Sequence, residues 1–241
     1  MSINSFAFVC VFMAIFVGSA VQGSVGLGLS LIAVPVGAIA FPTSVPGVFI
    51  MAGLPLSLIV MAKERTAIRW STVVPISLGR IPGALAGTAI VAVTSPRGIA
   101  LAAGVSVLAG AFVTARAPQI SQNTAAATIT GTIAGLTGTA AGIDGPPMAL
   151  YLQNAPHRTL RATLAACFVI GTGVSIIPLA LAGHLHIWQL QVAAGLIPAV
   201  VLGHAAAHRF LMHHVAARSR TLVLAVAAVA GTSAVVRALW F

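Results

Sequence analysis

The stretch VQGSVGLGLS, Val21 to Ser30, decides how the first part of this chain folds. It lies inside a long apolar segment, yet three of its ten residues are glycine. Glycine costs about 1 kcal/mol relative to alanine in a helix interior, and only helices and closed barrels span a bilayer. The stretch therefore predicts a helix that is interrupted inside the membrane.

The composition of the whole chain indicates an all-α polytopic membrane protein. Of its 241 residues, 59% are hydrophobic and only 6% are charged, and the mean hydropathy is +1.07. The net charge of +10 is spread between apolar runs instead of gathering on one face. We therefore expect the lipid bilayer as a partner and exclude nucleic acid.

Six apolar segments are each long enough to cross a hydrocarbon core of about 30 Å; they cover residues 45–62, 71–93, 97–115, 162–182, 187–206 and 221–238. Two further segments, residues 4–41 and 124–155, are too long for one span and are interrupted by glycines. The arms after the interruptions have about 13 and 9 residues, or roughly 20 and 14 Å as helix. Because such arms are too short to span, we predict re-entrant hairpins or broken helices, with two full spans in each segment as the alternative.

The distribution of positive charge predicts the orientation, because short cytoplasmic loops are rich in Lys and Arg. If both broken segments return to the side they entered, Arg97 and Arg237 lie on one side. The nine cations on the other side are Lys63, Arg65, Arg69, Arg116, Arg158, Arg161, Arg209, Arg218 and Arg220. A single crossing by the second segment would divide the same residues five to six. We therefore predict a multi-pass protein of the cell inner membrane with both termini outside.

An internal repeat accompanies the two glycine-rich interruptions. LGRIPGALAGTA (78–89) aligns without gaps on AGLIPAVVLGHA (194–205) at an offset of 116 residues, and the same offset places Gly26 on Gly142. Each half, 1–118 and 119–241, then holds one broken segment and three spans. An odd number of crossings inverts the second half relative to the first, and inverted repeats with interrupted segments are typical of secondary transporters. Close helix packing by glycine is the alternative interpretation.

These motifs resemble a known family. GSAVQGSVGLGLSLIAVP (18–35), KERTAIRW (63–70), GRIPGALAGT (79–88) and GTIAGLTGTAAGIDGPPMALYL (131–152) are together similar to the TauE/SafE family of sulfite and organosulfonate exporters. The resemblance covers essentially the whole chain. It implies a transporter without a cofactor, whose substrate is a small sulfur-containing anion such as sulfite, sulfoacetate or another organosulfonate. Asp144 departs from the family pattern, which usually has glycine there.

Arg80 is the strongest candidate for substrate binding. It is the one cation in the middle of a predicted span, where a charge costs from about 2.5 to well over 10 kcal/mol. The repeat places Leu196 at the equivalent position, so the fold does not itself require the cation. A guanidinium offers planar, charge-assisted donors to an oxyanion. The alternative is an arginine that snorkels or caps carbonyls freed by Pro75 and Pro82.

The glycine-rich interruptions are the second candidate element. A half-helix that begins after each interruption would point free N–H groups and the positive end of its dipole at an anion. We expect backbone and neutral side-chain groups to contribute to this site, namely those of Gln22, Gly23, Ser24, Gly26, Gly28, Thr139, Gly142 and Gly145. For each residue alone, a hydrogen bond within its own helix or a packing contact is the alternative.

Asp144 has several interpretations. It directly precedes Gly145, Pro146 and Pro147, a position that favours an N-cap for the following arm. The alternatives are an ion pair with Arg80 and a proton carrier. An unpaired carboxylate beside a bound anion would repel it, so an Asp144 close to substrate should be paired or protonated.

Other functions find less support in the sequence. His204 and His208 share a helix face, but no carboxylate or cysteine lies nearby, so we expect no metal site. An enzyme is not expected, because most histidines fall in loops and no Gly-x-Ser-Gly sequence occurs. The prediction is therefore a secondary transporter that exports a small sulfur-containing anion by alternating access. A transporter of another small anion or metabolite, or a binding subunit of a multicomponent importer, is the alternative; a homodimer is left open.

Overall fold

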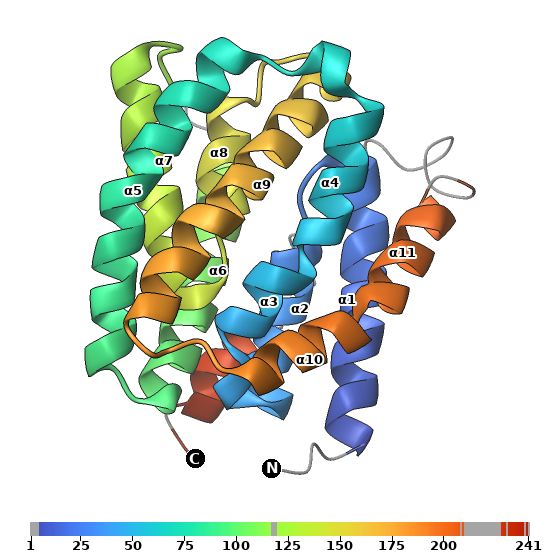
Figure 1. Cartoon of the computed structure of the whole chain (residues 1–241), viewed down its shortest axis with the longest axis vertical. Coiled ribbons are helices and arrows are strands. Elements are labelled where there is room, and N and C mark those ends of the chain that lie inside the picture. Colours follow the sequence, from blue (N-terminus) through green and yellow to red (C-terminus); the bar gives the residue numbers. More distant parts are fainter. Residues whose placement is uncertain are drawn as a thin grey trace.

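The computed structural model describes residues 5–116, 120–207, 209, 228–229, 231–238 and 240. Every regular element in these residues is a helix (Figure 1). Among them, five helices are long and apolar enough to cross a membrane: α1 (Ser5–Val25), α5 (Trp70–Val93), α6 (Pro96–Arg116), α9 (His157–Leu181) and the pair α10 (Ile187–Gly195) with α11 (Ile197–Ala206). The predicted all-α, multi-pass membrane protein is confirmed.

Both predicted interruptions are present. The first separates α1 from α2 (Leu29–Ala40), and the second separates α7 (Thr124–Ala141) from α8 (Gly145–Tyr151). Gly26, Gly28 and Gly142 have φ angles of 97°, 148° and 74°, a region that glycine occupies without a Cβ clash. The arms α2 and α8 have 12 and 7 residues, or roughly 18 and 10 Å. Neither arm is long enough to span.

Each arm turns back along the helix before it. Gln122 Nε2 donates a hydrogen bond to the Tyr151 carbonyl at 2.5 Å, and the Tyr151 hydroxyl donates to the Asn123 carbonyl at 3.3 Å. The end of α8 therefore lies beside the start of α7. Figure 1 shows α2 running back along α1, whose first turn lies at the end of the bundle opposite the loop between α4 and α5.

Two predicted spans are not single helices. Residues 45–62 form α3 (Gly47–Ala52) and α4 (Leu54–Lys63), flanked by the short 3₁₀ turns η1 (Pro42–Ser44) and η2 (Arg65–Ala67). Residues 187–206 form α10 and α11, which Leu196 separates. The reason is the same in both, because Pro55 and Pro198 have no N–H to continue the preceding helix. Most of the predicted span 221–238 lies outside the described residues.

Glycines let α5 and α7 meet backbone to backbone. A Cβ added at Gly79 or Gly83 of α5 would overlap the carbonyl oxygen of Thr128 or Thr132 on α7. From the other side, a Cβ at Gly131 would overlap the Ile76 carbonyl oxygen. Small residues at helix interfaces allow this close approach in membranes. The glycines in these spans are thus packing residues.

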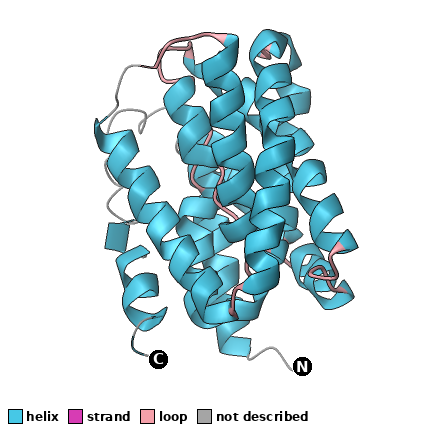
Figure 2. Cartoon of the chain, turned by 90° about the vertical axis from the view of Figure 1, so that its left-hand side faces the viewer, coloured by secondary structure: helices cyan, strands magenta, loops and turns pink. Residues whose placement is uncertain are grey.

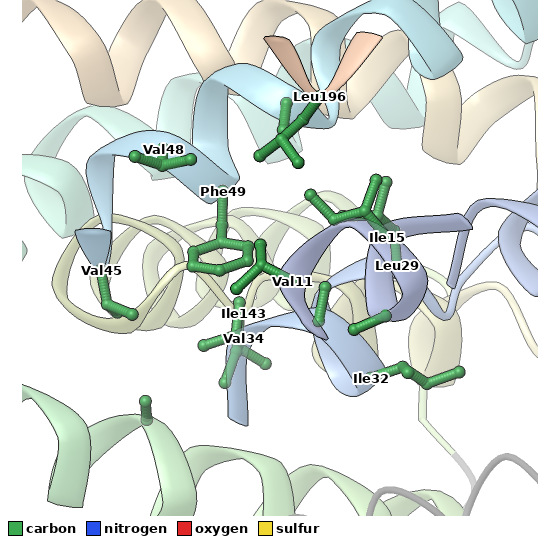
Figure 3. Packing of buried hydrophobic residues seen from close by; sticks show 14 of the residues in the cluster. Val11, Ile15, Leu29, Ile32, Val34, Val45, Val48, Phe49, Ile143 and Leu196 are labelled. Atoms are coloured by element: carbon green, nitrogen blue, oxygen red, sulfur yellow. The ribbon is translucent and has the colours of Figure 1, made fainter. Parts of the chain in front are cut away.

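The apolar core surrounds the interruptions. Figure 3 shows Phe49 of α3 beside Val34 of α2 and Ile143, which lies between α7 and α8. All three side chains are buried. In the turned view, loops lie inside the bundle as well as at its ends (Figure 2). Protein therefore covers the irregular backbone, as membrane depth requires. The division into inverted repeats, 1–118 and 119–241, stays a prediction.

Candidate functional site

A small cavity lies where the two interruptions meet. A Cβ added at Gly145 would contact the Leu27 side chain at 3.6 Å, which brings the two glycine-rich turns side by side. The cavity has a volume of about 40 Å³, enough for a few water molecules at about 10–15 Å³ each. Its walls come from α1, α2, α3, α4, α5, α7 and α9 and include Gln22, Leu29, Ser30, Phe49, Ile50, Gly53, Ser57, Arg80, Gly138, Gly142, Asp144, Phe168, Thr172 and Ser175.

Arg80 reaches this cavity from α5, and its side chain is 2% exposed. Its Nη2 donates to Asp144 Oδ2 at 2.7 Å, and its Nη1 lies 3.7 Å from the sulfur of Met148. Its Nε has no hydrogen-bond partner among the described residues. A buried guanidinium without all its partners is costly. Arg80 therefore lines the cavity and retains one buried donor without an acceptor among the described residues.

Two glycines make room for the guanidinium. A Cβ added at Gly171 of α9 would overlap the Arg80 Cζ. A Cβ at Gly138 of α7 would lie 3.4 Å from Arg80 Nη2 and 2.8 Å from Asp144 Cβ. The planar group is thus held between two helices at positions where any larger side chain would displace it.

Asp144 occupies the N-cap position of α8, as expected, but its side chain makes no cap hydrogen bond and pairs with Arg80 instead. Pro146 and Pro147 follow Gly145 and lack an N–H, so the start of α8 has few backbone donors to offer. The Asp144 side chain is 19% exposed, against 2% for Arg80. The carboxylate is therefore the part of the pair that the cavity reaches more easily.

The first interruption is organised by Gln22. Its Oε1 accepts a hydrogen bond from the N–H of Leu29 at 3.1 Å, which satisfies the first backbone donor of α2. Ser24 donates to the Ala20 carbonyl within its own helix at 3.0 Å, as the packing alternative predicts. The expected N-terminal donor of α2 is therefore already used by the chain itself.

The residues that the sequence predicts for the site divide into two groups. Four of them line the cavity: Gln22, Arg80, Gly142 and Asp144. The rest do not line it: Gly23 lies against His204, Gly26 against Arg161, Gly28 against Val21 and Gly145 against Phe168, while Thr139 donates to the Ser175 hydroxyl at 2.8 Å.

Several cavity residues do not stand out in the sequence. Ser57 of α4 and Thr172 and Ser175 of α9 line the cavity. In the sequence, the one feature that could point to these residues is a hydroxyl group inside an apolar span. That signal is weak, because such groups usually bond within their own helix, as Ser57 does to the Gly53 carbonyl at 3.0 Å.

A second buried ion pair lies next to the first interruption. Arg161 of α9 donates to both carboxylate oxygens of Glu64, through Nη2 and, at 3.4 Å, through Nε. Its Nη1 donates to the Gly23 carbonyl at 3.0 Å. The sequence gives no sign of this pair, because both residues lie in stretches that read as polar loops between spans. No group of three or more metal-binding side chains occurs within the described part of the chain.

Comparison with known proteins places the chain in a family. The model of the family described as sulfite exporter TauE/SafE matches residues 10–234. Comparisons with curated proteins and with solved structures found no match. The matched range includes both interruptions, Arg80 and Asp144. The chain therefore belongs to the sulfite exporter TauE/SafE family.

Proposed function

We propose that this protein is a secondary transporter that exports a small sulfur-containing anion, sulfite or an organosulfonate such as sulfoacetate, by alternating access. One observation above all supports the proposal. Arg80 is 2% exposed, borders a cavity between two helix interruptions and keeps an unpartnered Nε. Ionisable groups at membrane depth generally mark the path of an ion or substrate.

The chemistry of the cavity suits an oxyanion. A guanidinium presents several N–H donors in one plane and matches the geometry of carboxylate, phosphate and related oxyanions. The hydroxyls of Ser30 and Thr172, which line the same cavity, would add neutral donors around it. Phe49 and Phe168 add apolar wall, and an apolar surrounding strengthens each electrostatic contact.

The order of the helices supports alternating access. Adding the repeat offset of 116 to α1 gives residues 121–141, close to α7, and adding it to α5 gives 186–209, the region of α10 and α11. In space, α5 packs on α7 and α11 packs on α1. Each such contact thus joins the two halves of the chain. Two equivalent contacts of this kind would let one half rock against the other.

The membrane potential is a sufficient driving force for export. Moving one negative charge out of a negative cytoplasm releases about 2.3 kcal/mol per 100 mV. Export of a dianion at about 150 mV therefore releases roughly 7 kcal/mol, which supports a concentration ratio of about 10⁵ across the membrane.

A binding panel followed by transport tests the proposal. Purified full-length protein in detergent is titrated with sulfite, sulfate, taurine, sulfoacetate and phosphate, and binding is read by thermal shift and calorimetry. We expect the sulfur oxyanions to bind most tightly. Proteoliposomes loaded with sulfoacetate are then given potentials of either sign. Efflux that ignores the sign of the potential would contradict the electrogenic mechanism.

Arg80→Leu should abolish anion binding while the protein stays folded, because Leu196 already occupies the equivalent position in the repeat. Arg97→Leu is the matched control, since it removes the same charge from an exposed position. Calorimetry and size-exclusion chromatography measure affinity and folding. Unchanged affinity in Arg80→Leu would refute the site.

Two alternatives have distinct outcomes. Because the cavity selects charge and size rather than sulfur, another small anion or metabolite would appear as the tightest ligand of the panel. A binding subunit of a multicomponent importer would co-purify with an ATPase. Each result would replace the proposed substrate or role.

A further inference from the structure

The pairing of Arg80 with Asp144 sets a condition on anion binding. Arg80 Nη2 donates a hydrogen bond to Asp144 Oδ2 at 2.7 Å. The carboxylate therefore binds the same guanidinium that an anion would use. Together the two side chains have no net charge. An anion added to them would leave a net negative charge inside the membrane, where uncompensated charge is strongly disfavoured.

We propose that Asp144 takes up a proton when an anion binds Arg80, so that anion and proton bind this protein cooperatively. The inference rests on the proposed function. It follows that the guanidinium keeps one negative partner at a time, first the carboxylate and then the anion. The proton comes from water on the side to which the cavity is open and remains on the Asp144 carboxyl while the anion is bound.

The geometry of the pair permits this exchange. The contact is a single hydrogen bond, so one protonation is enough to release Nη2. Asp144 is 19% exposed and lines the cavity, so water can deliver the proton. The neutral carboxyl would then also offer an O–H donor to the anion.

The surroundings of Asp144 contain little else that titrates. Among the described residues, Arg80 of α5 and the Cys167 thiol of α9 are the titratable groups that interact electrostatically with Asp144. Gly138 of α7 lies against Asp144 and Gln22 of α1 lines the same cavity, and both are uncharged. Glu64, the other acidic residue of the chain, is held by Arg161 and does not line the cavity.

A zwitterionic substrate is the competing way to reach neutrality, because an ammonium group could face Asp144 while a sulfonate faces Arg80. The direct contact of the two charged side chains favours the proton. Arg80 Nη2 and Asp144 Oδ2 are 2.7 Å apart, which leaves no gap between them for the carbon chain that joins an ammonium to a sulfonate.

Calorimetry on the full-length protein tests the coupling. Sulfoacetate and methanesulfonate are the probes, because their charges do not change between about pH 6 and pH 9. Titrations in two buffers of different ionisation enthalpy at about pH 8 give the number of protons taken up. We expect about one proton per anion, and an affinity that falls up to about tenfold per unit rise in pH.

Two substitutions complete the test. Asp144→Asn should bind the probes with no proton uptake and with an affinity that does not depend on pH. Glu64→Gln, which removes the only other acid, should keep the uptake. Uptake near zero in the unaltered protein, or uptake that persists in Asp144→Asn, would overturn the coupling. Taurine binding more tightly than sulfoacetate, without proton uptake, would also overturn it in favour of a zwitterion.

The outcomes separate the two proposals. Anion binding without proton uptake leaves the transporter proposal standing and removes only the coupling. If none of the anions in the panel binds the unaltered protein, both proposals fail. Because proton uptake is measured first on the unaltered protein, the result does not depend on whether the Asp144→Asn variant folds.

Discussion

The chain has only two acidic residues, and each pairs with an arginine beside one of the two helix interruptions. At the first interruption, all three guanidinium nitrogens of Arg161 donate, two to Glu64 and one to the Gly23 carbonyl. At the second, Arg80 and Asp144 share one hydrogen bond, and Arg80 Nε has no partner among the described residues.

This difference separates a structural ion pair from a binding one. The Glu64–Arg161 pair ties the end of α4, the start of α9 and the end of α1 together, and neither residue lines the cavity. The Arg80–Asp144 pair borders the cavity with both members. We therefore expect substitutions at the first pair to change stability and substitutions at the second to change affinity.

Glu64→Ala should have the largest effect on stability. It leaves the Arg161 guanidinium, 11% exposed, without its carboxylate. Breaking such a pair by removing one partner lowers the free energy of unfolding by about 3–5 kcal/mol. Thermal and chemical unfolding in detergent measure the loss, and Glu64→Leu combined with Arg161→Met should recover most of it. A loss of anion affinity as large as that in Arg80→Leu would contradict the structural role.

Gly171→Ala should weaken anion binding at least about tenfold, or about 1.4 kcal/mol. The added Cβ overlaps Arg80 Cζ and pushes the guanidinium out of its place beside the cavity. Gly173→Ala is the control from the same helix, because nothing lies within 4 Å of its Cβ position. Equal affinities in the two variants, measured by calorimetry, would show that the position of the guanidinium does not matter.

Gln22→Ala should have the smallest effect, a loss of about 1 kcal/mol of stability. It removes the oxygen that accepts the N–H of Leu29 at the start of α2. Ser24→Ala is the comparison, since its hydroxyl only bonds within its own helix, and it should stay within about 0.5 kcal/mol of the unaltered protein. Thermal shift compares the two, and equal stability would argue against a capping role for Gln22.

The sequence predicts those features that depend on single residues with strong preferences. The glycines at positions 26, 28 and 142 require φ angles that other residues avoid, so both interruptions could be placed in advance. Arg80 also stands out, because one cation in an apolar span has few explanations. With two acids in the chain, Asp144 was already among its few candidate partners.

Features that depend on how distant helices meet could not be predicted in the same way. Arg161 lies 97 residues from Glu64 in the chain, and both look like loop charges until α4 and α9 are placed side by side. The hydroxyls of Thr172 and Ser175 have the same limitation, since their direction depends on the rotation of α9. The prolines at 55 and 198 were visible, but proline is also tolerated within membrane helices, as Pro75 and Pro82 are in α5.

The glycine contacts between α5 and α7 have a mechanical consequence. Arg80 belongs to α5 and Asp144 directly follows α7, so the helices that bring these two residues together are the ones whose backbones interlock through Gly79, Gly83 and Gly131. Sliding one helix past the other by a turn would drive side chains into carbonyl groups. The two helices therefore resist sliding past each other, and rocking of one half of the chain against the other would have to pivot at this contact.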